Sequence, residues 1–328
     1  MTSLSSRRLA RFLATASLFL LWSCRQDSPS PTGPQTMLLN STSSTPAHPA
    51  LTWGQYIMRN GSIVGSSLVV ADTDLSHQTA IIQNSSTNYG IQYNPVWSPT
   101  GGSIAFARYY PYTLGKPDSI FAIDVSVNNK GVPVGSNLRC IVPGCGRPGP
   151  AWSSTTSMGK IAYVSMGQPA ALYVVSQSGG TPASIYSTNS SSVGLGRPTW
   201  NPDDSKLAVP RSDGKVLIFS TSNWTLIDSV AVSGNIEWSR SGLDTLAIEN
   251  IGGGYYQPLY YCDPVTGATP AFGGVYVTRS QATWSPNNSA LIYATSNGAS
   301  VWKVHAFASD TTQIGSSMSI NGNINWKR

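Results

Sequence analysis

Short apolar runs alternate with clusters of turn-forming residues from residue 51 to residue 328. A Trp ends the first run of each unit, and Ser-Pro, Asn-Pro or other small polar residues follow it. Pro fixes φ and removes a hydrogen-bond donor, while Asn, Asp and Gly tolerate turn geometry, so this pattern ends one strand and reverses the chain. A second apolar run begins seven to nine residues after the Trp. Each unit therefore predicts a pair of antiparallel strands.

The unit occurs six times, around Trp97, Trp152, Trp200, Trp238, Trp284 and Trp326. The intervals between successive tryptophans are 55, 48, 38, 46 and 42 residues, a period typical of propeller blades rather than of helical solenoids or leucine-rich arrays. A third apolar run follows in five units, at 120–124, 171–175, 216–219, 259–263 and 301–304. A weaker fourth run follows it, as at 225–230, which predicts four antiparallel strands per blade.

The two ends of the array predict how many blades there are. Residues 51–83 contain the later strands of a unit without a preceding Trp-turn, and residues 322–328 contain only a Trp-turn. Together they make one split blade, so we expect an all-β, six-bladed propeller in which the C-terminal strand closes the ring by pairing beside residues 55–59. Closure hides the edge strands that an open array would expose.

The motif Trp-Ser-Pro at 97–99, followed by a turn and by Ile-Ala-Phe at 104–106, resembles the repeats of the TolB-type periplasmic β-propellers and their relatives with WD-like repeats. The resemblance covers residues 51–328. The Asp-Gly that usually follows Trp-Ser-Pro is replaced in this chain, and no α/β domain precedes the propeller as it does in TolB. The resemblance implies the fold and a place in the cell envelope, and it does not extend to TolB's own partners.

The N-terminal segment has the layout of a secretory signal, with Arg7, Arg8 and Arg11 before an apolar stretch at 12–22. The stretch is too short for a membrane-spanning helix. Leu21 and Ser23 before Cys24 resemble a bacterial lipobox, which implies a signal peptide at 1–23 and a lipidated Cys24. Ordinary signal-peptide cleavage and an uncleaved anchor are the alternatives. The absence of Asp after Cys24 favours the outer membrane, by resemblance to enterobacterial sorting.

Residues 24–50 are rich in Ser, Pro and Thr and show no apolar period, so we interpret them as the lipidated Cys and a tether. The alternative is a leader without a role. The formal net charge of +6 falls to +3 once the three signal-peptide arginines are removed, and no basic run remains. Nucleic acid is therefore not an expected partner.

The remaining cysteines and histidines predict no metal site and no cofactor. Cys140 and Cys145 flank a short loop in an exported chain, which favours a disulfide over two free thiols. Cys262 matches Ile123 of another blade and is expected to be buried. His77 and His305 are isolated and fall on the face opposite the start of the innermost strands. No nucleophile-elbow motif occurs, and Asp203 with Asp204 is interpreted as a β-turn.

Equivalent residues three positions before each Trp should form a ring at one mouth of the central channel. They are Asn94, Gly149, Arg197, Asn235, Gln281 and Asn323. Two aromatic loops are expected on the same face, with Tyr109, Tyr110 and Tyr112 in one and Tyr255 and Tyr256 in the other. Amides and tyrosines around a concave mouth suit ligand recognition. The alternative is that these groups are solvated strand starts and rings that cap their blades.

These observations favour a monomeric, lipid-anchored envelope protein that binds a peptide or protein partner at the channel mouth. A glycan ligand at the same face is the alternative. An enzyme of the lyase or hydrolase type is the less favoured one. The sequence predicts a binding role because the amides and tyrosines can hold a ligand but offer little chemistry to transform it.

Overall fold

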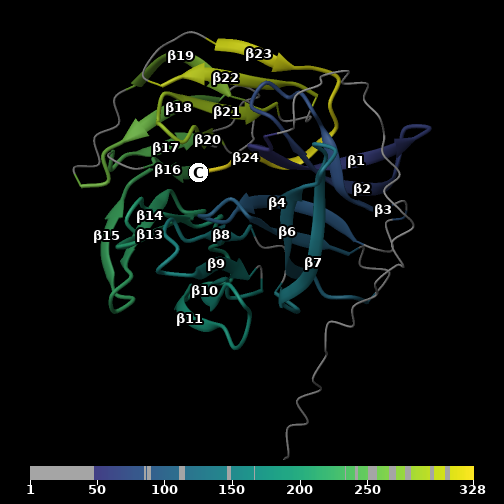
Figure 1. Ribbon diagram of the computed structural model, residues 1–328. Coiled ribbons are helices and arrows are strands. Elements are labelled where there is room, and N and C mark those ends of the chain that lie inside the picture. The colour runs from purple at the N-terminus through teal and green to yellow at the C-terminus, as the bar shows by residue number, and fades with distance from the viewer. Residues whose placement is uncertain are drawn as a thin grey trace, which may run out of the picture.

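The computed structural model describes residues 48–328 except 85, 87–89, 111–114, 146–148, 166, 233, 241–242, 250–256, 266–270, 278–281, 296–298 and 307–310; at 257–258 and 271–277 it describes the backbone alone. All regular elements in this part of the chain are β-strands, arranged as six antiparallel sheets of four strands around a centre (Figure 1). The predicted six-bladed β-propeller is confirmed. None of the described residues forms a helix with the length and apolar character needed to cross a membrane.

Each blade runs from an innermost strand at the centre of the ring to an outermost strand at its rim. From inside to outside, blade I contains β24 (Ile320–Trp326), β1 (Leu51–Arg59), β2 (Ser62–Ala71) and β3 (Thr79–Asn84). Blade II contains β4 (Ile91–Trp97), β5 (Ser103–Tyr109), β6 (Ser119–Val127) and β7 (Pro133–Val142). Blade III contains β8 (Ala151–Trp152), β9 (Lys160–Ser165), β10 (Ala171–Ser176) and β11 (Ala183–Ser187).

Blade IV contains β12 (Thr199–Trp200), β13 (Lys206–Arg211), β14 (Lys215–Ser220) and β15 (Leu226–Val230). Blade V contains β16 (Asn235–Trp238), β17 (Leu246–Glu249), β18 (Gln257–Cys262) and β19 (Ala271–Val277). Blade VI contains β20 (Thr283–Trp284), β21 (Ala290–Ala294), β22 (Val301–His305) and β23 (Thr311–Gly315). The innermost strand of every blade ends at the tryptophan of its repeat.

The ring closes through the split blade, as the two ends of the sequence predict. The C-terminal β24 is the innermost strand of blade I and lies against β1 (Figure 1). Their register pairs Leu51 with Trp326 and Gln55 with Ile320, with a shift after Trp53. The prediction that β24 pairs beside residues 55–59 is therefore wrong in register. The first half of β1, which is buried, pairs with β24, whereas residues 58–59 at its other end are exposed.

The hydrophobic core consists of six clusters, one at each junction between neighbouring blades. Each repeat's Trp lies in the cluster between its own blade and the preceding one, and all six tryptophans are between 0% and 7% exposed. An indole fills the wedge between two sheets that diverge from the centre. Two indoles also reach across the junction, since Trp200 Nε1 donates to Ala151 O at 3.0 Å and Trp284 Nε1 donates to Glu237 O at 3.2 Å.

The residue after the Trp holds the turn that follows. Its side-chain oxygen accepts a hydrogen bond from the backbone N–H of a residue five to seven positions later, with distances of 2.8–3.2 Å, at Ser98, Ser153, Asn201, Ser239 and Ser285. The bond ties the turn to the start of the second strand, which is why Ser or Asn follows the Trp in these five repeats.

Turns of adjacent blades are also joined to each other. The carboxylate of Asp204 in blade IV accepts hydrogen bonds from Ser154 and Thr155 of blade III, the latter at 2.7 Å. The equivalent Asn288 of blade VI accepts one from Arg240 N of blade V at 2.6 Å. Asp204 N also donates to Asn201 O at 3.1 Å, which confirms the predicted β-turn. Asp204 therefore joins two blades.

Candidate functional site

The centre of the ring is lined by the six innermost strands. Of the positions three before each Trp, Asn235 begins β16, Gly149 and Arg197 stand two residues before β8 and β12, and Asn94 and Asn323 lie in the middle of β4 and β24. The structure brings neighbouring members of this predicted ring together. Asn94 Oδ1 accepts a hydrogen bond from Asn323 N at 3.4 Å, and Arg197 packs on Gly149. Gln281 lies outside the described residues.

Arg197 occupies the space beside Gly149 and leaves no room there for a larger residue. A Cβ on Gly149 would lie 2.9 Å from Cγ and Cδ of Arg197, closer than such atoms approach in practice. The guanidinium Nε of Arg197 donates to Pro150 O at 3.1 Å, so the side chain crosses from blade IV to blade III. Arg197 keeps some contact with solvent, yet desolvation lowers its pKa, with Glu237 opposing that shift.

The side chain of Asn323 is buried without hydrogen-bond partners among the described residues. It is 2% exposed, and neither Nδ2 nor Oδ1 of its side chain has a hydrogen-bond partner among the described residues. Buried amides are almost always hydrogen-bonded, because desolvating one without a partner costs about 1–3 kcal/mol. The side chain of Asn323 is therefore suited to meeting a ligand or an ordered water inside the ring.

The interior also holds a buried arginine next to the innermost strand of blade V. Arg240 follows β16, is 6% exposed, and directs Nη2 to Glu237 Oε1 at 3.4 Å, Thr283 Oγ1 at 3.2 Å and Trp326 O at 3.5 Å. Its Nε is buried without a partner among the described residues. Desolvation lowers the pKa of Arg240, and Glu237 opposes that shift.

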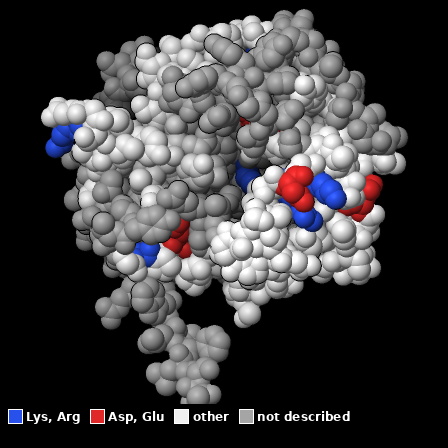
Figure 2. All heavy atoms as spheres, turned by 180° about the vertical axis from the view of Figure 1, so that it is seen from behind, with Lys and Arg blue, Asp and Glu red and all other residues white. Residues whose placement is uncertain are grey.

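Arg328 completes this group at the C-terminal end of the chain, which lies in the middle of the ring (Figure 1). Desolvation lowers its pKa to about 9, with Arg240 and Arg197 adding to the decrease and Glu237 and Asp204 opposing it. Figure 2, the opposite view, shows basic side-chain atoms deep in a central hollow. The interior is a desolvated region that holds three arginines together with the buried acids Glu237 and Glu249.

Asn235, another ring member, is paired with a buried acid. Its Nδ2 donates to Glu249 Oε2 at 3.0 Å, and Glu249 is 2% exposed, with no partner for Oε1 among the described residues. Burial raises the pKa of Glu249 to about 7, and the bond from Asn235 only partly opposes this. The group therefore changes protonation near neutral pH.

The two predicted aromatic loops are described only in part. Tyr112, Tyr255 and Tyr256 lie outside the described residues, and Tyr109 and Tyr110 are half-buried. Tyr110 is held by its own blade: its N–H donates to Asp118 Oδ1 at 2.9 Å, and Lys116 Nζ lies 5.7 Å from its ring centre.

The predicted disulfide between Cys140 and Cys145 is absent, because Cys145 is a free, buried thiol. Cys145 packs in the core cluster between blades II and III, whereas Cys140 packs against the cluster between blades I and II. The two side chains thus leave β7 and its following turn towards opposite faces of the blade. Cys262 is a buried free thiol at the position equivalent to Ile123, as expected.

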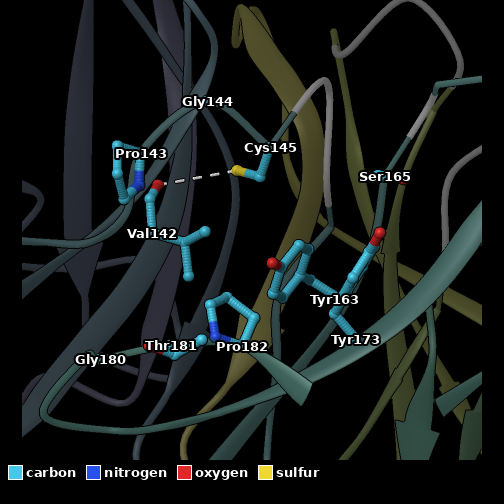
Figure 3. Close-up of a pocket in the computed structure, with 10 residues that line it drawn as sticks. All are labelled: Val142, Pro143, Gly144, Cys145, Tyr163, Ser165, Tyr173, Gly180, Thr181 and Pro182. Carbon is cyan, nitrogen blue, oxygen red and sulfur yellow. Dashed lines mark hydrogen bonds between the residues drawn. The ribbon is translucent and has the colours of Figure 1, made fainter. Parts of the chain in front are cut away.

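A groove of about 430 Å³ lies between blades II and III, next to Cys145 (Figure 3). Val142 and Pro143 lie on one side of it, and the stacked rings of Tyr163 and Tyr173, 5.3 Å apart, lie on the other. The Cys145 thiol donates to Val142 O at 3.7 Å, and burial raises its pKa to about 12. The thiol is therefore protonated at neutral pH and is a poor nucleophile.

The histidines lie where the repeat pattern places them. His77 lies between β2 and β3 and its Nδ1 is 2.8 Å from Asp72 Oδ2, while His305 ends β22 and is exposed. Within the described ranges, no three His, Cys, Asp or Glu residues come together as metal ligands would. Cys24 and the tether up to residue 47 lie outside those ranges.

Glu237, Arg240 and Glu249 were not identified from the sequence, although the repeats contain the signal. Arg240 stands two positions after its Trp, where Pro99, Pro202 and Pro286 stand in other blades. Glu249 stands in the register position occupied elsewhere by small or apolar residues, which are Gly54, Ala107, Val164, Pro210 and Ala294. For Glu249, a charge at a position that is small or apolar in the other blades is the signal that could have found it. The positions of Glu237 and Arg240 vary more between blades and carry a weaker signal.

Comparisons with known proteins agree with the fold. No protein-family model and no curated protein sequence matches the chain. Among solved structures, TolB from Acinetobacter baumannii is similar with a TM-score of 0.65 and 14% identity, over 85% of this chain and 66% of that one. A putative TolB from Agrobacterium tumefaciens has a TM-score of 0.55 and 10% identity, over 84% of this chain and 92% of that one. The structure of a nidogen/laminin complex has a TM-score of 0.62 and 11% identity, over 85% of this chain and 98% of that one. The chain has the fold of a TolB-like propeller.

Proposed function

We propose that this protein is exported, is anchored in the cell envelope by a lipid on Cys24, and binds a segment of a protein partner at the channel mouth. The N-terminal leader with its lipobox-like Leu21-to-Cys24 motif supports export and anchoring. The likeness to TolB structures supports an envelope protein built for interaction, and the nidogen/laminin structure is a protein complex.

The observation that carries the binding proposal is the side chain of Asn323, which has no partner among the described residues. Asn323 lies in the middle of β24, beside Asn94 in the middle of β4. An extended peptide can supply both a donor and an acceptor to a single amide. Arg197 at the same level of the ring adds a charged donor. A binding pocket is usually concave and well packed, and a small number of polar groups converge in it.

Binding is favoured over catalysis by the state of the candidate nucleophiles. Burial raises the pKa of Cys145 to about 12 and that of Cys262 to about 11, so both thiols are protonated near neutral pH. Glu237 is engaged by Arg240 and Glu249 by Asn235. We therefore propose no catalytic residue.

The test is in-cell crosslinking of the tagged full chain followed by mass spectrometry of the membrane fraction. Three variants accompany the wild type: Arg197→Gln at the mouth, Cys24→Ser in the lipobox, and Arg139→Gln as the control. Arg139 is a partly exposed arginine of the outermost strand β7, where its salt bridge to Asp124 at 2.8 Å contributes about 0–1 kcal/mol.

We expect one protein to be enriched with the wild type and with Arg139→Gln and to be lost with Arg197→Gln. Cys24→Ser should leave the membrane fraction. A partner captured equally by Arg197→Gln would contradict binding at the mouth, and a Cys24→Ser protein that stays in the membrane would contradict the lipid anchor. Specific binding to a glycan array without a protein partner would replace the peptide by a sugar.

A further inference from the structure

Three arginines converge inside the channel from three different blades. Arg197 precedes β12, Arg240 follows β16 and Arg328 follows β24. Desolvation is the main cause that lowers the pKa of Arg197 and of Arg328. The charge of Arg240 lowers both pKa values further, and the charge of Arg197 also lowers that of Arg328. Like charges are gathered in a desolvated space only at a considerable free-energy cost.

Two acids oppose these three cations, and one of them is already engaged elsewhere. Glu237 contacts Arg240 at 3.4 Å, whereas the Asp204 carboxylate accepts its hydrogen bonds from Ser154 and Thr155 of the neighbouring turn. Glu237 is therefore the acid in direct contact with these arginines, through Arg240.

The group also has unused hydrogen-bonding capacity. Arg240 is 6% exposed and its Nε has no partner among the described residues, although Nη2 is directed to three oxygens. Nε and an adjacent Nη form the fork with which a guanidinium binds a carboxylate through two parallel hydrogen bonds. The 3.4 Å contact to Glu237 is longer than a strong charge-assisted hydrogen bond, so Glu237 does not use this capacity fully.

We propose that the channel interior binds one carboxylate from an acidic side chain of the peptide partner, held by Arg240 with Arg197 and Arg328. The inference rests on the proposed function, because the peptide backbone would lie at the mouth beside Asn323 while its acidic side chain enters the channel. Glu237 already contacts the guanidinium of Arg240 and therefore competes with an entering carboxylate for it. The carboxylate must bind Arg240 more strongly than Glu237 does.

The test uses two small probes that differ only in charge, N-acetyl-glutamate methylamide and N-acetyl-glutamine methylamide, titrated into the intact protein and followed by NMR of the arginine Nε–H groups. We expect saturable binding of the glutamate probe and at least about tenfold weaker binding of the neutral one, as loss of a charge-assisted hydrogen bond implies. Equal affinities, or no binding of the glutamate probe, would overturn the proposal. Tighter binding of inorganic phosphate would replace the peptide carboxylate by a free inorganic anion.

Two variants with opposite expected effects make the assignment specific. Glu237→Gln removes the competitor and should bind the glutamate probe about tenfold more tightly, whereas Arg197→Gln should bind it about tenfold more weakly. Arg139→Gln, outside the channel, should bind it like the wild type. Because Glu237→Gln increases an affinity, an unfolded variant cannot produce the expected result. An unchanged or weakened affinity in folded Glu237→Gln would overturn the site.

The outcomes also separate this proposal from the broader one. If crosslinking finds a partner that depends on the mouth but the glutamate probe does not bind, the carboxylate site fails and the binding function stands. If the probe binds with the expected response to Glu237→Gln while no partner is found, the anion site stands and the protein partner fails.

Discussion

The junctions between blades and the interior of the channel are formed by the same six repeats, yet they obey different rules. At the junctions the repeats agree: each Trp is buried, and each Ser or Asn that follows it in blades II to VI holds its turn. In the channel they disagree, since Arg240 and Arg328 stand at a position that is Pro in three of the other blades and Ser in the fourth.

The difference follows from what each region has to do. A junction must bury apolar area, and the same solution serves six times because the geometry is the same. The channel is shared by all blades, so a charge contributed by one blade serves the whole ring and need not be repeated. Positions that repeat therefore stabilise the protein, while positions that break the repeat are the candidates for recognition.

Removing the closing strand should have the largest effect on the junctions. Deletion of residues 320–328 takes β24 away from β1 and takes Ile324 and Trp326 out of the core cluster between blades VI and I. It leaves blade I with an exposed inner edge, and we expect loss of cooperative unfolding in circular dichroism and calorimetry. A truncated chain that melts like the full chain would contradict closure by the split blade.

Replacing a single junction Trp should destabilise the protein less than deleting β24 does, and a nearby Trp provides the control. Trp284 is fully buried between blades V and VI, and Trp302 packs against the same cluster while remaining partly exposed. We expect Trp284→Ala to lower the free energy of unfolding by about 3–5 kcal/mol, because the cavity can collapse only in part. Trp302→Ala should cost clearly less in the same urea titrations, and equal costs would refute the special role of the repeat's Trp.

The blades were predictable from the sequence because they depend on local patterns. Period-2 apolar runs, a Trp and a turn recur at a fixed distance, and each of the six sheets contains a Trp where the sequence placed it. The register of β24 on β1 was not predictable in the same way. It is set by which half of β1 is buried against blade VI, a contact between segments about 270 residues apart.

The positions along the innermost strands were predictable, but the chemistry around them was not. Counting three residues back from each Trp identified Asn94, Asn235 and Asn323, which lie in the innermost strands, and Arg197, which stands two residues before β12. The partners of these side chains come from other strands or other blades, as Glu249 does for Asn235, and no spacing within one repeat reveals them. The failed disulfide has the same cause, because the side chains of Cys140 and Cys145 face different junctions although only five positions separate them in the sequence.

The smallest effect concerns Glu249, the one acid in a register position that is otherwise small or apolar. Burial raises its pKa from 4.5 to about 7, so the folded protein retains a proton that the unfolded chain releases. Its ionisation therefore opposes folding: the contribution is absent below about pH 4.5, grows as the pH rises towards 7, and reaches roughly 3 kcal/mol above it. Glu249→Gln should match the wild type in free energy of unfolding at pH 4.5 and exceed it at pH 8. Urea titrations at both pH values measure this difference, and a gap that is independent of pH would show that Glu249 stays ionised in the folded protein, as a surface acid would.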